Sequence, residues 1–325
     1  MAEAKRPAAL RLGIIGTGVA ANDLFFPALG ELRGAVEVVA VANRRRAKAV
    51  AFAKRLGGAR VHDSGEALLR DPAVEAVLLL LPIHLTASWV LASLRAGKHV
   101  LSEKPVAASV AEGKRLVKQA KRYDRVWLVG ENFFFTPHIA RARDWVREGE
   151  LGEVRLVEAS QLTRITPDNK YYRTSWRQSP RHAGGFVLDS GVHLANVLRE
   201  MFGTPKRVLR LTAGLDPRLP PIDTAVAAFD LEGGALGVWK SCFSLETGDE
   251  VPMLRAYGSR ANIEVYYARS LLLPHGRRPK TATSPHDGFY AELAHFRACV
   301  RGRDELRFRP EDALADLDLI ERIVR

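Results

Sequence analysis

Three side chains in this sequence could carry out proton transfer. Lys104 lies in Ser102-Glu103-Lys104-Pro105, after a short apolar run. A partly desolvated lysine can donate or accept a proton near neutral pH, and Glu103 and Pro105 would fix its position. Asp189 and His193 are four residues apart, so on a helix the carboxylate could hold the imidazole and set its tautomer. Taken alone, Lys104 would be interpreted as a surface lysine, and His193 could be part of a solvated helix face.

A glycine-rich turn follows the first apolar run. Leu12 to Ile15 leads into Gly16-x-Gly18-x-x-Ala21, and a helical pattern comes next. In a dinucleotide site the first glycine permits the tight turn, the second lets the backbone approach a pyrophosphate, and the third small residue lets the helix pack on the strand. A turn without a ligand could show the same glycines, but a βαβ pattern around them favours the nucleotide.

The end of the second expected strand carries no acidic residue. Enzymes that use NAD usually place Asp or Glu there to bind the ribose 2′-hydroxyl. This chain has Ala42-Asn43-Arg44-Arg45-Arg46 instead. Arginines pair well with a phosphate, and cations are unfavourable at a helix start, so a ligand role is favoured. Asn43 could still bond a ribose hydroxyl. We predict NADP as the cofactor, with NAD as the alternative.

The first 129 residues alternate between short apolar runs and helical stripes. This alternation is typical of a doubly wound parallel sheet, and the almost continuous apolar run Val74 to Leu81 is expected of a strand buried on both faces. We predict an α/β fold with an N-terminal Rossmann domain over residues 1–129. Its expected strands are 12–15, 36–42, 59–62, 74–81, 99–101 and 125–129, and helices are expected after the glycine turn and over 45–56, 65–69, 85–95 and 109–121.

From residue 130 the pattern becomes that of an α+β domain, over 130–325, with a large, open, mostly antiparallel sheet. The pair Gly184-Gly185 predicts a close backbone approach, and 274–286 is expected to be a mobile loop. Helices on one face would leave the other face to pack against a second subunit, as a homodimer or homotetramer. The expected strands are 154–163, 208–212, 224–231, 235–243, 253–257, 261–265 and 270–273, and the expected helices are 136–149, 189–202, 289–300 and 310–324.

Composition excludes several classes of protein. Cys242 and Cys299 have no spacing for a disulfide framework or a zinc site, so we expect reduced core cysteines and no metal. No apolar run is long enough for a membrane span, and Met1 to Arg6 lead into no signal-peptide core, which predicts a cytoplasmic protein. The net charge of +12 could indicate nucleic acid or an anionic ligand, but the basic residues are scattered. We therefore expect a basic solvated surface and no nucleic-acid partner.

These features together resemble one family. The glycine-rich opening, Glu103-Lys104-Pro105, Trp176-Arg177 ahead of Gly184-Gly185, Asp189-x-x-x-His193 and the closing region 296–320 occur in the order and spacing of the glucose–fructose oxidoreductase / inositol dehydrogenase / MocA (Gfo/Idh/MocA) family. The resemblance covers nearly the whole chain. It implies a two-domain NAD(P)-dependent oxidoreductase.

The resemblance also implies roles for individual residues. Lys104 would lie near the nicotinamide and share proton transfer with His193, and Asp189 would orient or tune that pair. The expected cofactor-binding residues are Gly16, Thr17, Gly18, Val19, Ala20, Asn43, Arg44, Arg45, Leu81, Pro82, His84, Glu103, Lys104, Asn132, Trp176 and Arg177. The expected substrate-binding residues are Lys104, Tyr172, Asp189, His193 and Asn196.

Two departures from the family pattern concern the substrate. Members often carry Asp where Asn196 stands, so one contact to a polyol hydroxyl is altered here. They also often carry a basic residue in the segment 130–135, where this chain has three phenylalanines. Those rings indicate either a more apolar substrate pocket or core packing.

We predict reversible hydride transfer between nicotinamide C4 and a carbinol carbon, or its ketone, in a sugar, polyol or related carbohydrate-like molecule. The resemblance also permits redox-assisted elimination or glycoside cleavage, in which NAD(P) is regenerated in each turnover. A regulatory protein that senses NADP without catalysis is another alternative, against which the set Lys104, Asp189 and His193 argues.

Overall fold

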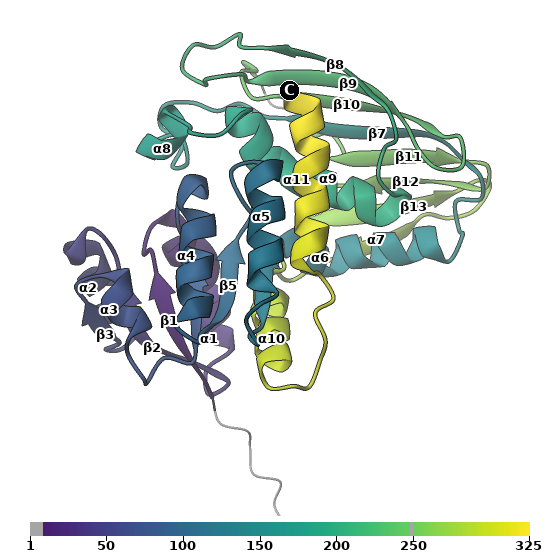
Figure 1. Ribbon diagram of the computed structural model, residues 1–325. Coiled ribbons are helices and arrows are strands. Elements are labelled where there is room, and N and C mark those ends of the chain that lie inside the picture. The colour runs from purple at the N-terminus through teal and green to yellow at the C-terminus, as the bar shows by residue number, and fades with distance from the viewer. Residues whose placement is uncertain (1–8, 248–249) are drawn as a thin grey trace, which may run out of the picture. The chain divides into compact units, whose positions relative to one another are not determined.

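The computed structural model describes residues 9–247 and 250–325 and divides by internal contacts into two compact units (Figure 1). Met1 to Arg6, from which no signal peptide is expected, lie outside the described residues. The first unit comprises the chain up to Val106, Lys114–Gly130 and Phe289–Pro310. The second comprises Ala107–Gly113, Glu131–Gly288 and Glu311–Arg325. A linear boundary between residues 129 and 130 takes no account of these returns, and it stays a prediction.

The first unit contains a six-stranded parallel sheet in the order β3-β2-β1-β4-β5-β6, as predicted for a doubly wound fold. The central strand β4 is buried along its whole length, which explains its unbroken apolar sequence. It is shorter than predicted and ends before Pro82. The strands are β1 Leu10–Ile15, β2 Val36–Ala42, β3 Arg60–His62, β4 Ala76–Leu79, β5 His99–Glu103 and β6 Trp127–Gly130.

The helix α10 (Phe289–Val300) packs in this first unit although it follows the longest segment of the second unit in sequence. Its Phe289 ring lies edge-on to Phe25, with the ring centroids 5.0 Å apart. An amphipathic pattern predicts the helix but does not say which sheet its apolar face covers. The other helices of this sheet are η1 Ala21–Phe25, α1 Phe26–Glu31, α2 Arg46–Arg55, α3 Gly65–Leu69, α4 Ile83–Arg95 and α5 Val110–Ala120.

The second unit contains an eight-stranded sheet in the order β14-β13-β12-β11-β7-β10-β9-β8. Its paired neighbours are antiparallel except β7 and β10, which run parallel. The predicted class, a Rossmann fold followed by a mostly antiparallel sheet, is confirmed. The strands are β7 Val154–Leu162, β8 Val208–Ala213, β9 Thr224–Asp230, β10 Leu236–Cys242, β11 Leu254–Gly258, β12 Ala261–Val265, β13 Arg269–Pro274 and β14 Lys280–Thr283.

The strand β14 corrects the prediction of a mobile loop over 274–286. Lys280–Thr283 pair with β13 as the edge of the sheet, beyond a turn at Gly276. Only one residue of this strand is even half-buried, so the sequence shows no apolar alternation there. Lysine and threonine are nevertheless common on exposed edge strands.

Helices α7 and α9 pack against one face of this sheet (Figure 1). The predicted helix 136–149 is α7, which begins at Pro137. A short helix that was not predicted, α6, precedes it and is separate because proline at the start of α7 cannot continue the turn before it. The helix α9 begins four residues earlier than predicted and is buried along most of its length. The helices are α6 Asn132–Phe135, α7 Pro137–Arg147, α8 Ser175–Gln178, α9 Gly185–Phe202 and α11 Pro310–Val324.

The opposite face of the sheet exposes apolar side chains on β8, β9 and β10. Leu209 and Leu211 are 76% and 81% exposed, and Val226 lies directly across from Leu211 on the neighbouring strand. Leu236, on β10, is also exposed. These positions alternate with inward side chains such as Ala227 and Trp239, so they share one outer face.

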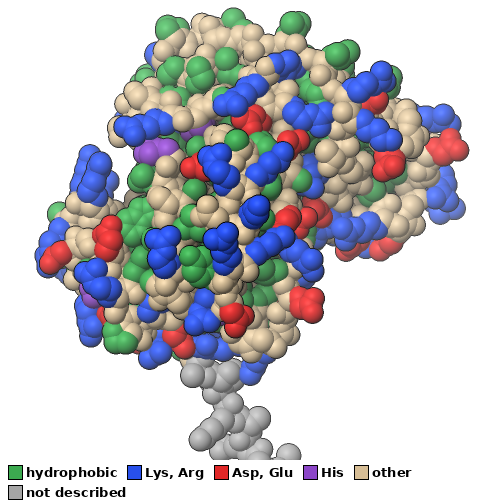
Figure 2. Space-filling view, in the orientation of Figure 1, with side chains coloured by type: hydrophobic (Ala, Val, Ile, Leu, Met, Phe, Trp, Pro, Cys, Tyr) green, Lys and Arg blue, Asp and Glu red, His purple; other side chains and the backbone are tan. Residues whose placement is uncertain are grey.

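Basic side chains are spread over the surface in Figure 2, interspersed with acidic ones, on the face shown. Many of them form ion pairs with exposed carboxylates, such as Arg141 with Glu148. Among the residues that the structure describes, no helix is both long enough and apolar enough to cross a membrane.

Candidate functional site

The glycine turn after β1 has the geometry that a pyrophosphate requires. Gly16 has a φ of +100°, and a Cβ there would lie 2.2 Å from the carbonyl oxygen of Leu80. Gly18 differs, because a Cβ there would meet nothing within 4 Å. The backbone at Gly18 therefore faces open space, and a helical stretch begins at Val19. Open backbone at a helix start is suited to phosphate oxygens.

Two asparagine side chains hold this turn. The Asn43 amide donates to Thr17 Oγ1 at 3.0 Å, and its oxygen accepts the backbone N–H of Arg45 at 2.9 Å. Thr17 is buried, and Asn22 donates to the Gly18 carbonyl at 2.8 Å. Asn43, predicted to contact a ribose, thus also links the phosphate turn to the end of β2.

The end of β2 exposes two arginines and carries no acidic residue. Arg44 and Arg45 are exposed, and no carboxylate occurs between residues 42 and 46. Arg46 pairs with Asp63 at 2.8 Å. Together with the open backbone at Gly18, these groups could hold the phosphates of a dinucleotide.

The segments that follow β4 and β5 begin at the same edge of the sheet as this turn. β4 lies between β1 and β5, with Leu79 paired to Ser102. Ligands of doubly wound folds bind beyond the carboxyl ends of such strands. Glu103 and Lys104 are half-buried there, as are the other predicted residues on the β4 side, Leu81, Pro82 and His84.

The second unit gives His193 a carboxylate partner that was not predicted. Its Nδ1 lies 2.6 Å from Oε1 of Glu131, and the two side chains are 16% and 2% exposed. The ring of Phe133 stacks on the imidazole, with centroids 4.5 Å apart and an interplanar angle of 16°. The hydrogen bond expected between His193 and the Asp189 carboxylate is therefore wrong, and a role of Asp189 in tuning Lys104 and His193 stays a prediction.

Asp189 pairs instead with Arg177, predicted to lie over the cleft. Arg177 Nε donates to Asp189 Oδ2 at 2.6 Å, and both side chains are largely buried. The guanidinium lies over two rings, 4.0 Å from the centroid of Trp176 and 5.1 Å from that of Tyr171. Arg177, Asp189, Trp176 and Tyr171 thus form one cluster, because a planar cation can stack on rings and donate a hydrogen bond at the same time.

Asn196 is also a predicted substrate contact, but it is buried. Only 1% of it is exposed, and its amide donates to Asp316 of α11 at 3.0 Å. Asp316 also contacts Arg199, and burial raises the pKa of Asp316 to about 8. The face of α9 that carries Asp189 and Asn196 is therefore an interior face, and the role of Asn196 toward a substrate stays a prediction that its burial weighs against.

The other predicted residues of this unit also have structural partners. Asn132 is buried and donates to the carbonyl of Asp287 at 2.6 Å. Tyr172 is half-buried, and its backbone N–H is directed at Asn169 Oδ1. Neither geometry tests a ligand contact, so both roles stay predictions.

The pair Gly184-Gly185 does bring backbones together, but within this chain. Gly184 and Gly185 have φ of +83° and +49°, and a Cβ at Gly185 would lie 2.4 Å from the Pro220 carbonyl oxygen. A Cβ at Gly184 would lie 2.9 Å from the Val324 side chain. The glycines thus serve the packing at the start of α9.

Lys104 belongs to the first unit, and Asp189 and His193 belong to the second. The predicted nucleotide turn and Lys104 thus belong to one unit, and the other two predicted acid–base residues belong to the other. Sequence reasoning missed Glu131 because it lies 62 residues before His193. A carboxylate is unusual in a buried segment such as the one that contains Gly130 and the three phenylalanines. This position of Glu131 is the feature of the sequence that could have indicated a role for it.

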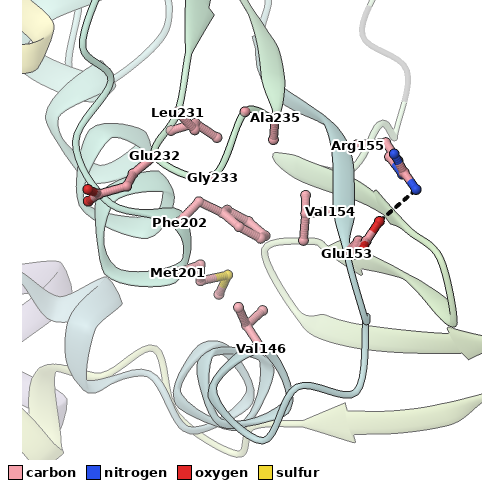
Figure 3. Close-up of a pocket in the computed structure, with 11 residues that line it drawn as sticks. Val146, Glu153, Val154, Arg155, Met201, Phe202, Leu231, Glu232, Gly233 and Ala235 are labelled. Atoms are coloured by element: carbon pink, nitrogen blue, oxygen red, sulfur yellow. Dashed lines mark hydrogen bonds and ion pairs between the residues drawn. The ribbon is translucent and has the colours of Figure 1, made fainter.

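A cavity of about 570 Å³ lies elsewhere in the second unit (Figure 3). Its wall includes Met201, Phe202 and Val154, and Glu153 pairs with Arg155 beside it. It contains none of the predicted site residues. Among the described residues, no cluster of His, Cys, Asp or Glu could hold a metal ion. Cys242 and Cys299 are both free thiols, and burial raises the pKa of Cys299 to about 11.

Models of one protein family match both the N-terminal and the C-terminal part of this chain. Residues 10–131 match the model of the oxidoreductase family with an NAD-binding Rossmann fold, and residues 143–325 match the C-terminal alpha/beta domain of the same family. The dehydrogenase FPY6 of Fusarium mangiferae is 30% identical over 336 residues, which cover 96% of this chain and 95% of that protein.

Solved structures give the same result. An oxidoreductase of Thermotoga maritima is 31% identical, with a TM-score of 0.91 over 98% of this chain and 96% of its own. KijD10, a 3-ketoreductase of Actinomadura kijaniata crystallised with NADP and TDP-benzene, is 25% identical, with a TM-score of 0.82 over 97% of both chains. The chain belongs to the Gfo/Idh/MocA family of NAD(P)-binding oxidoreductases.

Proposed function

We propose that this protein is an NADP(H)-dependent oxidoreductase that acts on a secondary alcohol or ketone of a sugar, polyol or related small molecule. The observation that carries the cofactor choice is the end of β2, where Arg44 and Arg45 are exposed and no carboxylate is present. A free ribose would leave these cations without an anion, whereas a 2′-phosphate pairs with them. KijD10, which binds NADP and TDP-benzene, supports the same choice by similarity.

The acid–base groups of the reaction are Lys104 and His193. When bound, the nicotinamide supplies or accepts the hydride. On oxidation, Lys104 or His193 removes the hydroxyl proton, and on reduction the same group returns a proton to the carbonyl oxygen. Asp189, paired with Arg177, holds the short helix α8 that carries Trp176. Positioned acid–base catalysis of this kind contributes roughly 10²- to 10⁴-fold to the rate.

A substrate screen with Lys104→Met tests the proposal. Purified protein is incubated with NADPH and a panel of keto sugars, including nucleotide-linked ones, and NADPH absorbance is followed together with the alcohol product. We expect one NADPH consumed per product. Conversion without net NADPH change would replace this proposal with redox-assisted elimination.

Lys104→Met should lower kcat by about 10²-fold or more and leave the Kd for NADPH nearly unchanged. Lys114, exposed on α5 of the same unit, provides the matched control Lys114→Met. Equal losses of turnover and NADPH affinity in Lys104→Met would exclude the catalytic role.

We also infer that two copies associate through the outer face of the eight-stranded sheet. Leu209, Leu211, Val226 and Leu236 form an exposed apolar row on this face. Rows of this kind on a sheet are typical of an interface. Leu211→Glu should reduce the molar mass measured by light scattering, whereas Leu215→Glu, at an exposed leucine in the loop after β8, should not. A monomeric wild-type protein would overturn this inference.

A further inference from the structure

The mechanism above uses His193 but gives no role to Glu131, the carboxylate bonded to it. Glu131 directly follows β6 and begins the turn into α6, where it is 1% exposed. One of its oxygens, Oε1, lies 2.6 Å from His193 Nδ1. The other, Oε2, is buried without a hydrogen-bond partner in the described part of the chain. Burying a carboxylate costs free energy, so a buried glutamate of this kind indicates a structural or functional role.

A backbone N–H group determines which of the two side chains, Glu131 or His193, carries the proton of their hydrogen bond. The Phe133 N–H donates to the same Glu131 oxygen, Oε1, at 3.2 Å. That oxygen therefore acts as an acceptor, and the proton of the short contact belongs on His193 Nδ1. An imidazole that carries its proton on Nδ1 has a lone pair on Nε2 when it is neutral.

The imidazole is held on its face as well as on one edge. Phe133 stacks on it, and the ring of Tyr267 stands edge-on to Phe133 with centroids 6.0 Å apart. His193 Nε2 takes no hydrogen bond from any residue that the structure describes. The His193 side chain keeps 16% of its surface exposed, and Nε2 is its remaining reactive edge.

We propose that Glu131 is the positioning residue of His193: it holds the proton on Nδ1 and leaves Nε2 as the atom that exchanges a proton with the substrate. This inference rests on the proposed function. It assigns to Glu131 the orienting role that the sequence assigned to Asp189. Phe133 completes the arrangement by supplying both the backbone donor and the stacking ring.

Two other carboxylates of this unit are paired with arginines. One turn before His193 on α9, Asp189 is paired with Arg177. On α11, Asp316 contacts Arg199, and the charge of Glu131 contributes to the raised pKa of Asp316. Glu131 is thus the carboxylate that is hydrogen-bonded to His193.

The tautomer of His193 can be measured without substrate or cofactor. The full chain is labelled with ¹⁵N-histidine, and long-range ¹H–¹⁵N correlation spectra are recorded for the wild type, Glu131→Gln and Glu131→Ala. His193→Gln identifies the resonances among the nine histidines. We expect wild-type His193 to carry its proton on Nδ1, with an unprotonated Nε2 at alkaline pH.

The two Glu131 variants should differ. In Glu131→Gln the Phe133 N–H keeps the amide oxygen toward His193, so the Nδ1 tautomer should persist. Glu131→Ala removes the acceptor, so His193 should populate both tautomers. Its kcat should fall about 10- to 100-fold, with KM and the Kd for NADPH little changed, and Glu131→Gln should recover much of this loss. The control is Glu158→Ala, which removes a carboxylate paired with Lys240 on the eight-stranded sheet.

A wild-type proton on Nε2, or an unchanged tautomer in Glu131→Ala, would overturn the inference. If Glu131→Ala does not fold, the wild type and Glu131→Gln still decide it, because a change of tautomer in Glu131→Gln would contradict the role of Phe133. A confirmed tautomer together with no turnover of any carbonyl compound would refute the proposed function and leave the positioning of His193 established.

Discussion

A Cβ atom on Gly16 would lie 2.2 Å from the carbonyl oxygen of Leu80, whereas one on Gly18 would meet no atom within 4 Å. Two glycines of one turn therefore have different purposes. Gly16 is required by the fold, since its φ is +100° and a neighbouring strand end approaches it. Gly18 is free of such packing, and its lack of a side chain leaves room for a ligand.

Gly16→Ala should lower the free energy of unfolding by roughly 3 kcal/mol, from steric overlap and backbone strain. Gly18→Ala should change it by less than about 0.5 kcal/mol but weaken NADPH binding more than about 10-fold, because a methyl group would stand where phosphate oxygens approach. Urea unfolding and nicotinamide fluorescence measure the two effects. Normal NADPH affinity in Gly18→Ala would mean that the nucleotide does not use this turn.

Arg44→Ala should reduce the affinity for NADPH by about 10- to 100-fold and leave the affinity for NADH nearly unchanged. A hydrogen-bonded charge pair with phosphate contributes about 1.5–3 kcal/mol, and NADH has no 2′-phosphate. Separate titrations of the two nucleotides measure this difference. Arg95→Ala, at an exposed arginine in the last turn of α4, controls for the loss of a positive charge. A parallel loss for NADH and NADPH would contradict a 2′-phosphate contact.

Arg177→Met and Asp189→Asn should be non-additive in stability. The Arg177–Asp189 pair is largely withdrawn from solvent, with exposures of 16% and 8%, so removing either partner leaves the other poorly compensated. We expect a coupling free energy of about 1–3 kcal/mol in a double-mutant cycle from chemical unfolding. Simple addition of the two single effects would show that solvent screens this pair.

Asp71→Asn should destabilise the first unit by roughly 1–3 kcal/mol at neutral pH. The backbone N–H of Ala73, followed by His62 and Arg60, holds the pKa of Asp71 below its ordinary value of 3.8. A lowered pKa means that the folded state binds the proton less tightly than the unfolded state. The stabilisation is thus present above about pH 4 and is lost as the pH falls through the pKa of the folded state.

Thermal unfolding of the wild type and Asp71→Asn between pH 8 and pH 3 tests this sign. The difference between the two proteins should stay constant from pH 8 to about pH 5 and narrow below pH 4. Glu66→Gln, on α3 of the same unit, serves as the control. A difference that grows as the pH falls would mean that Asp71 is not a stabilising anion.

The nucleotide half of the site was predictable from sequence because its determinants are local. Gly16 and Gly18 are in one turn, Arg44 is the second residue after one strand, and Lys104 directly follows another. Strand ends of a parallel sheet meet at one edge by rule, so the order of elements places these segments together. The structure adds the partners within this half, such as Asn43 with Thr17.

The acid–base half was only partly predictable. The spacing of Asp189 and His193 places them on one helix, and the structure confirms the helix. Spacing cannot say which carboxylate an imidazole meets, because a helix side chain can also be bonded by a residue from another element. Glu131 reaches His193 from a turn 62 residues earlier, and Arg177 takes Asp189.

By itself the sequence determined the class of the fold, the family and the nucleotide turn, since hydrophobic period, glycine positions and strand-end residues act over a few neighbours. Only the tertiary structure decided that α10 returns to the first unit, that Lys280–Thr283 extend the sheet, and that Glu131 rather than Asp189 holds His193. These outcomes depend on packing and hydrogen bonds between segments far apart in the chain, whose geometry no local pattern records.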